Sequence, residues 1–208
     1  MQGQPSPSTG GPLSSTTDSP PKGVLSLPAE LREQIYALLV VKPRNTITML
    51  SNHACFASEV SASQPALSRV NHQLRHETLA TFYSSNVFLA ELSEHADLAT
   101  ALRWLESIGE VNVGRLRHLA LCGWTRVPFG HMMVRRWVRV VFDLKEGRME
   151  LHDSETLPQR SQLMMAIERM KESFGNLVVA RGGRRFDSES LIGLMRGFHA
   201  LCEAHKVA

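Results

Sequence analysis

The chain has 208 residues, of which 43% are hydrophobic and 21% are charged, a composition typical of a globular protein. This length allows one well-buried domain, or a small motif joined to one. The net charge of +3 is too small to indicate a nucleic-acid-binding protein by itself, and three widely spaced cysteines form neither a disulfide framework nor a C-x-x-C metal pair.

Residues 1–23 are rich in Ser, Thr, Pro and Gly, and they carry too little apolar surface to offset the entropy of ordering. We therefore expect a disordered tail. The segment lacks the apolar core of a signal peptide, and no uncharged apolar run elsewhere is long enough to cross a bilayer. The sequence predicts an intracellular protein, cytoplasmic or nuclear, without a membrane segment.

The first predicted helix begins at Pro28 and runs to about Val41. Proline loses no hydrogen bond at the first helical position, and Glu30 in the first turn meets the positive end of the helix dipole. The apolar residues of this helix have the i, i+4, i+7, i+8 spacing of one continuous stripe: Leu31, Ile35, Leu38 and Leu39.

A second helix is predicted from Pro65 to about Tyr83. It follows a connection over residues 42–64, which contains a short strand near residues 46–50. Its inward residues share a helical spacing: Leu67, Val70 and Leu74, with Leu79, Phe82 and Tyr83 at its end. The two helices and their connection define a region from residue 24 to residue 84.

The order of strand and helix patterns over residues 85–208 predicts an α+β module that continues from this helical region. Strands at 87–90 and 116–121 flank a helix at 94–108, and this order predicts a parallel βαβ unit with a right-handed crossover. The helix is amphipathic and ends at Gly109.

An antiparallel hairpin and two helices complete the module. The hairpin strands, 137–144 and 148–152, flank a three-residue loop in which Gly147 supplies a left-handed residue. A helix at 158–174 is predicted to end at Gly175, and a last helix spans 187–205. The buried face of the last helix is predicted to hold Leu191, Met195, Phe198 and Cys202.

No catalytic, metal or cofactor site is predicted, so we expect a protein that is not an enzyme. Nucleophile and nucleotide motifs such as G-x-S-x-G, H-E-x-x-H and G-x-G-x-x-G are missing. His72 and His76 have the spacing of two metal ligands, but no third ligand is indicated, which favours solvated histidines. An active site hidden from motif analysis would gather His118, Cys122 and Asp143 near strand ends.

Two groups of arginines stand out. They are Arg135, Arg136 and Arg139 near the hairpin, and Arg181, Arg184 and Arg185 before the last helix. If the fold joined them, they would form a positive patch able to meet phosphate or an acidic protein surface. A solvated face is the simpler interpretation.

Several sequence motifs occur in a fixed order along the first part of the chain. They are LPAELREQIYALL at 27–39, PALSRVNHQLRHE at 65–77, FYSSNVF at 82–88, WLESIG at 104–109 and RLRHLAL at 115–121. From about Leu25 to Trp124 this series resembles the F-box-like proteins common in filamentous fungi. The family is related to a fungal group with two E-x-R motifs, but here the second motif reads Gln73-Leu74-Arg75.

The predicted elements together indicate an α+β fold in which the F-box-like N-terminal helices pack with a small mixed sheet, one βαβ unit plus a hairpin, and C-terminal helices. The resemblance implies a protein-interaction function, as a substrate receptor of a cullin–RING ubiquitin ligase. In an F-box, apolar side chains insert into a Skp-type adaptor protein, and residues 85–208 would bind an unknown target. The implied adaptor-binding residues are Leu27, Pro28, Leu31, Ile35, Leu39, Val70 and Leu74.

The connection over residues 42–64 departs from an F-box, in which the helices follow one another closely. The same apolar stripe could therefore pack on this protein's own sheet, which would make the chain a non-enzymatic scaffold. A nucleic-acid-binding protein is the third alternative, although no base-reading element is evident and the aromatic content is only 6%.

Overall fold

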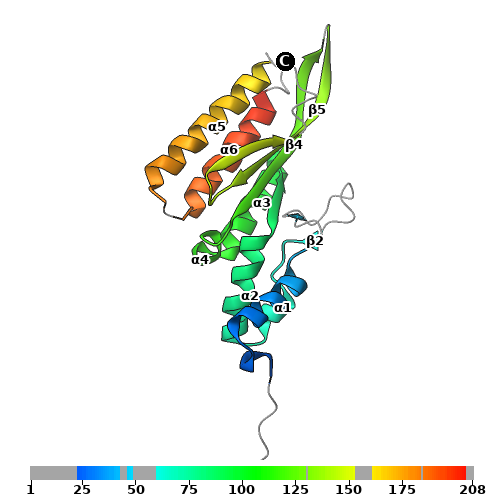
Figure 1. Ribbon diagram of the computed structural model, residues 1–208. Helices are drawn as coiled ribbons and strands as arrows, with labels where there is room; N and C mark the ends of the chain where they lie inside the picture. Colours follow the sequence, from blue (N-terminus) through cyan, green and yellow to red (C-terminus); the bar gives the residue numbers. More distant parts are fainter. Residues whose placement is uncertain are drawn as a thin grey trace, which may run out of the picture.

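The computed structural model describes residues 23–42, 46–48, 60–129, 131–152, 161–183 and 185–204. The predicted tail therefore lies outside the described residues, except for Gly23. The molecule is elongated, with α1 and α2 at one end, and β4 and β5 reaching the opposite end (Figure 1). A sheet with helices on one face lies between these ends.

The N-terminal helices are two α-helices with a 3₁₀ turn in front of each. They are η1 (Val24–Ser26), α1 (Ala29–Val40), η3 (Ala66–Arg69) and α2 (His72–Ser85). The prediction of one continuous helix from Pro65 to Tyr83 was wrong. Asn71 has extended backbone angles, and its side chain accepts a hydrogen bond from the Leu74 amide at 2.8 Å. Asparagine favours this capping position, so α2 starts anew after it.

The sheet is mixed and has the strand order β2-β1-β3-β4-β5-β6. The strands are β1 (Thr46–Thr48), β2 (Val60–Ser61), β3 (Val87–Glu91), β4 (His118–Phe129), β5 (Met132–Asp143) and β6 (Arg148–His152). The predicted short strand near 46–50 is confirmed over residues 46–48. The first four strands of this order pair in parallel, and the last three are antiparallel.

The predicted parallel unit is confirmed. Strands β3 and β4 pair in parallel, with Phe88 opposite Leu119, and α3 (His95–Ile108) and the short α4 (Glu110–Val113) connect them. A capping box formed by Glu94 and Asp97 starts α3. Gly109, with φ of +75°, follows its last residue.

The antiparallel part of the sheet is longer than predicted. The hairpin of β5 and β6 is confirmed, but β5 ends at Asp143, so its loop has four residues rather than three. The Asp143 carboxylate accepts hydrogen bonds from the backbone N–H groups of Lys145 and Glu146, and these bonds stabilise the turn. A second hairpin, of β4 and β5, was not predicted. It pairs the two strands over their full length, from His118 opposite Asp143 to Phe129 opposite Met132.

Two C-terminal helices, α5 (Gln162–Arg181) and α6 (Ser188–Ala204), pack side by side on the sheet (Figure 1). The prediction that Gly175 ends the first of them was wrong. Leu177 and Val178 continue its apolar face and pack against the core, so the helix runs on until Gly182, which has φ of +57°. The predicted buried face of α6 is confirmed for all four residues, since Leu191, Met195, Phe198 and Cys202 are buried.

One hydrophobic core connects these elements, which confirms an α+β fold. It extends from Val40 at the end of α1, through Phe82 and Phe88, to Phe198 on α6. The N-terminal helices therefore share a core with the rest of the chain. Among the described residues, none of the helices has both the length and the apolar character needed to cross a membrane.

Candidate functional site

Glu77 on α2 holds α1 in place through charged hydrogen bonds. Arg32 of α1 donates from both Nε and Nη2 to the two carboxylate oxygens of Glu77, each at 2.9 Å. Tyr36 also donates from its hydroxyl to Glu77 at 2.8 Å, and Gln73 donates to it at 3.0 Å. These bonds, above all those from Arg32, lower the pKa of Glu77 from 4.5 to about 2.

The side-chain amide of Asn86 connects the C-terminal ends of α1 and α2 by hydrogen bonds. Its Nδ2 donates to the carbonyl oxygens of Val40 at 3.1 Å and Phe82 at 2.8 Å, and its Oδ1 accepts from the Lys42 amide at 3.0 Å. Asn86 is fully buried, and these bonds satisfy both sides of its amide. The C-terminal ends of α1 and α2 are thereby joined.

These contacts decide which face of α1 is buried. Arg32, Tyr36 and Val40 recur every four residues and face α2, and the last two are at most 2% exposed. The leucine stripe lies on a different side of the helix. Leu38 is 85% exposed, Leu39 59% and Leu31 46%.

The residues predicted to bind an adaptor are only partly available at the surface. Leu31, Leu39, Pro28 and Val70 are exposed, whereas Leu27 and Ile35 are half-buried. Val70 is 65% exposed rather than turned inward, because the chain breaks between η3 and α2. Leu74 is 4% exposed and belongs to the interior, so its inclusion in the predicted docking set is corrected.

The two predicted arginine groups do not share one site. Arg181 and Arg185 line a cavity of about 640 Å³ together with Arg115, Arg117 and Lys145. Arg135, Arg136 and Arg139 belong to β5, and none of them lines this cavity. Arg135 instead lies over the ring of Trp124 at 4.9 Å. Arg184 lies outside the described residues.

Arg115, Arg117 and Lys145 were not predicted as site residues. Arg115 and Arg117 belong to the segment before β4 and Lys145 to the turn between β5 and β6, and only the fold brings these segments together. The weak signal available was the density of basic residues around Arg115-Leu116-Arg117.

The residues weighed for chemistry are not assembled into a reaction centre. His118 Nδ1 lies 3.8 Å from Asp143 Oδ2, but Cys122 is four residues further along β4, or roughly 13 Å away. His72 and His76 are exposed on α2. Within the described ranges, no group of three or more His, Cys, Asp or Glu residues could hold a metal ion.

Comparisons of the chain with protein-family models, with curated proteins and with solved structures find no match. Any functional assignment therefore depends on the sequence motifs and on the geometry described above.

Proposed function

We propose that this chain is an F-box-like protein-interaction protein whose N-terminal helices dock a Skp-type adaptor of a cullin–RING ubiquitin ligase. Residues 85–208 would then present a target protein to the ligase. In this function the chain acts by binding other proteins. It needs no catalysis, no metal and no cofactor. Its place of action would be intracellular, cytoplasmic or nuclear.

The observation that carries this proposal is the outward leucine stripe of α1. Exposed large apolar side chains gather on the N-terminal elements, at Leu25, Leu31, Leu38, Leu39 and Val70. Of the eleven exposed large hydrophobic residues in the described part of the chain, these make up five. A concentration of exposed apolar side chains is typical of a surface that a partner covers, and a helix face with such anchors suits docking into a groove.

The motif residues support the proposal in a second way. Arg32, Tyr36, Gln73 and Glu77 all come from the two helical motifs. Arg32 and Tyr36 of α1 donate across to Glu77 of α2, and Gln73 donates to Glu77 within α2. Polar motif residues thus join the two helices, while Leu31, Leu38 and Leu39 of the first motif stay exposed for an external partner. This division of roles is what a docking helix requires.

The scaffold alternative needs the stripe to be interior core. Only Ile35, which is half-buried, fits that requirement among the four residues of the stripe. The face of α1 that contacts α2 is instead formed by Arg32, Tyr36 and Val40. The geometry therefore favours docking over the scaffold.

Co-purification with a Skp-type adaptor tests the proposal. We expect the wild-type chain to retain the purified adaptor and the double variant Leu38→Asp/Leu39→Asp to lose it, because charges on these two side chains would have to enter the apolar contact. Both positions are exposed, so the variant should keep the wild-type melting temperature.

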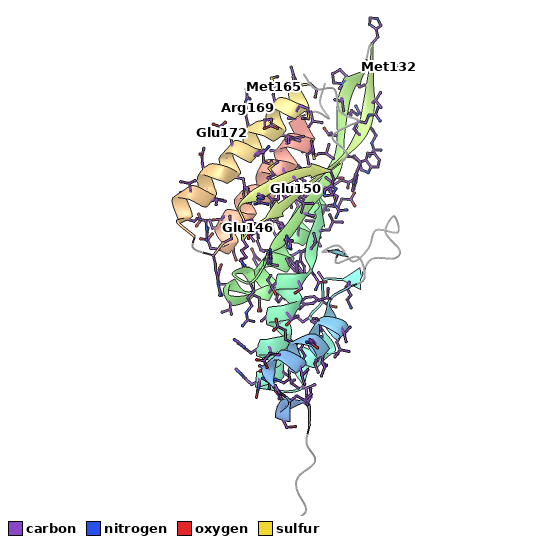
Figure 2. The ribbon with its side chains drawn as sticks, in the orientation of Figure 1. Met132, Glu146, Glu150, Met165, Arg169 and Glu172 are labelled. Carbon is purple, nitrogen blue, oxygen red and sulfur yellow. The ribbon has the colours of Figure 1, made fainter. Side chains whose placement is uncertain are left out.

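Met165→Asp is the matched control. Met165 is 52% exposed, close to the value for Leu39, and it lies on α5 far from α1 (Figure 2). This variant should bind the adaptor as the wild type does. Failure of the folded wild-type chain to bind any Skp-type adaptor would exclude the proposal, and so would undiminished binding by the double variant.

A further inference from the structure

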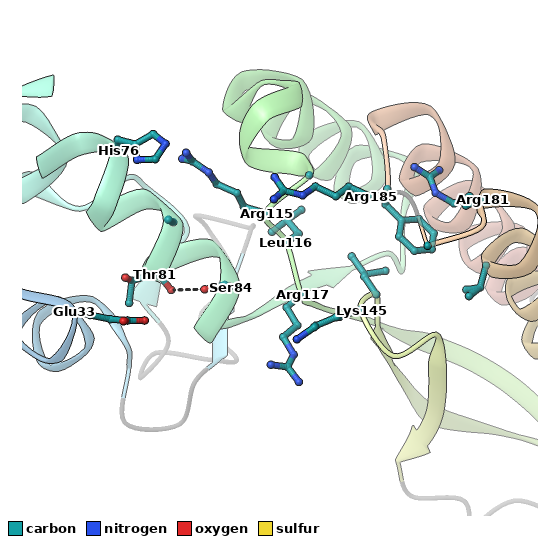
Figure 3. A pocket seen from close by; sticks show the side chains of 16 residues that line it. Glu33, His76, Thr81, Ser84, Arg115, Leu116, Arg117, Lys145, Arg181 and Arg185 are labelled. Atoms are coloured by element: carbon teal, nitrogen blue, oxygen red, sulfur yellow. Dashed lines mark hydrogen bonds between the residues drawn. The ribbon is translucent and has the colours of Figure 1, made fainter. Parts of the chain in front are cut away.

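A cavity of about 640 Å³ lies where the N-terminal helices meet the remainder of the chain (Figure 3). Its walls come from α1 and α2, from the segment 114–117 before β4, from the turn between β5 and β6, and from the end of α5 with the loop that follows. This volume is within the range of small-molecule and peptide side-chain sites.

The charge of the lining is strongly positive. Arg115, Arg117, Lys145, Arg181 and Arg185 contribute cationic side chains, and Glu33 is the one carboxylate that lines the cavity among the described residues. These cations come from three separate segments of the chain, so the concentration of charge is a product of the fold.

Two of the five cations have carboxylate partners. Arg181 Nη1 lies 3.3 Å from Asp187 and donates to Ser190 at 2.6 Å, and Arg117 Nε lies 3.9 Å from Asp143. Each of these two cations therefore has an opposite charge within 4 Å.

The other three cations are not matched. Arg115 donates to the neutral side chain of Asn112 at 3.0 Å, and neither Arg115, Arg185 nor Lys145 forms an ion pair with any described residue. Arg115 and Arg185 lie close to one another across the top of the cavity (Figure 3). Burial lowers the pKa of Arg115, and the positive charge of Arg185 lowers it further.

The position of Arg185 is fixed by its packing. Its Cδ would lie 3.3 Å from a Cβ atom at Gly114, so its stem lies directly against the Gly114 backbone. This contact places Arg185 beside Arg115, the residue that follows Gly114, and each guanidinium group can present a fork of N–H donors. Two like charges held together in this way favour binding of an anion between them.

We infer that this cavity binds a ligand that carries a phosphate monoester, with Arg115, Arg185 and Lys145 as its main charge partners. A phosphate monoester has a charge near −2 at neutral pH and three acceptor oxygens, which suits three unmatched cations better than a single carboxylate does. Leu116, Leu144 and Phe186 form an apolar part of the wall, which suits the organic part of such a ligand. This site is separate from the leucine stripe of α1, so it does not depend on adaptor docking.

Binding of defined phosphate compounds to the full chain tests the inference. The probes are adenosine 5′-monophosphate, a phosphoserine peptide and the same peptide without phosphate, measured by isothermal titration calorimetry. We expect at least one phosphorylated probe to bind, and its affinity to fall as salt is raised. Tighter binding of the nucleotide would indicate a free organophosphate as ligand, whereas preference for the phosphopeptide would indicate a modified protein.

The double variant Arg115→Gln/Arg185→Gln should weaken this binding at least about tenfold, because two charge-assisted contacts are lost. The control Arg103→Gln/Arg196→Gln removes the same charge from exposed positions on α3 and α6 and should bind as the wild type does. Lys145→Gln, in an exposed turn, is a further variant whose folding is not at risk, and it should also weaken binding. The inference is overturned if no phosphorylated probe binds at millimolar concentration, or if these cavity variants bind as tightly as the control.

Discussion

At the scale of single residues, Glu77 has the largest consequence for stability. It accepts four hydrogen bonds from three side chains, and two of these bonds come from the guanidinium of Arg32. A carboxylate in this setting stabilises the folded state only while it is ionised. The depressed pKa therefore makes the packing of α1 on α2 sensitive to acid.

The pH dependence of this contribution has a defined sign. The folded-state pKa of Glu77 is about 2, below the ordinary value of 4.5, so its stabilising effect is fully present above pH 4.5 and is lost as the pH falls toward 2. We expect Glu77→Gln to lower the free energy of unfolding by about 1–3 kcal/mol at pH 7. Urea unfolding from pH 7 to pH 2 should show this difference shrinking below pH 4.5.

Glu106→Gln provides the comparison for this measurement. Glu106 is an exposed carboxylate on α3, and its side chain makes no hydrogen bond with any described residue. Its substitution should change stability by less than about 0.5 kcal/mol at any pH. A difference between Glu77→Gln and the wild type that stays constant down to pH 2 would contradict the proposed role of the Arg32–Glu77 pair.

At the scale of elements, local patterns predicted α3 and α6 well because each has an apolar face bounded by a clear start or end signal. The same reasoning predicted the bounds of α1 but did not identify the face of this helix that packs against α2. Its inner face contains Arg32, whose partner Glu77 is 45 residues away, and no local pattern reveals such a pair. The leucine stripe was therefore identified as one face of a helix, but whether that face is exposed or buried stayed open until the fold showed that Leu31, Leu38 and Leu39 are exposed.

The cavity and the long hairpin were missed for a related reason. Residues 122–136 show no turn signal strong enough to mark two 12-residue strands, and their pairing depends on each strand completing the other. The cationic lining depends in turn on this sheet, because Arg115, Arg117 and Lys145 lie at the strand ends that the sheet brings together. Single residues at such ends carry no shared spacing in the sequence.

The extension of α5 through Gly175 leads to a prediction for this helix. A Cβ atom at Gly175 would meet nothing within 4 Å, and the residue has helical surroundings on both sides. Gly175→Ala should therefore raise the free energy of unfolding by about 0.5–1 kcal/mol. Gly182→Ala should instead lower it by about 1 kcal/mol, because φ there is +57° although space is equally open. Thermal unfolding of both variants checks this, and stabilisation by Gly182→Ala would refute the helix end assigned here.

At the scale of the whole molecule, the N-terminal helices proposed to dock an adaptor and the cavity share one hydrophobic core. Phe88 of β3 shows this most directly, because it is fully buried and its ring contacts those of Phe82, Tyr83 and Trp104. Through these ring contacts Phe88 packs against both α2 and α3. The parallel pairing of β1 with β3 extends the same sheet toward the N-terminal region. A boundary near residue 84 therefore separates sequence motifs rather than independently folding domains.

Scanning calorimetry of the full chain should accordingly show one transition with equal calorimetric and van't Hoff enthalpies. Phe88→Leu should shift that transition as a whole to lower temperature, with a loss of about 1–2 kcal/mol, because it changes the shape of a site shared by both regions. Far-ultraviolet circular dichroism and tryptophan fluorescence should report the same midpoint, since Trp104 lies in this cluster and Trp124 and Trp137 lie in the β4–β5 hairpin. If Phe88→Leu split the transition in two, the N-terminal helices would be a separate folding unit, and the adaptor-docking face could be removed without loss of the cavity.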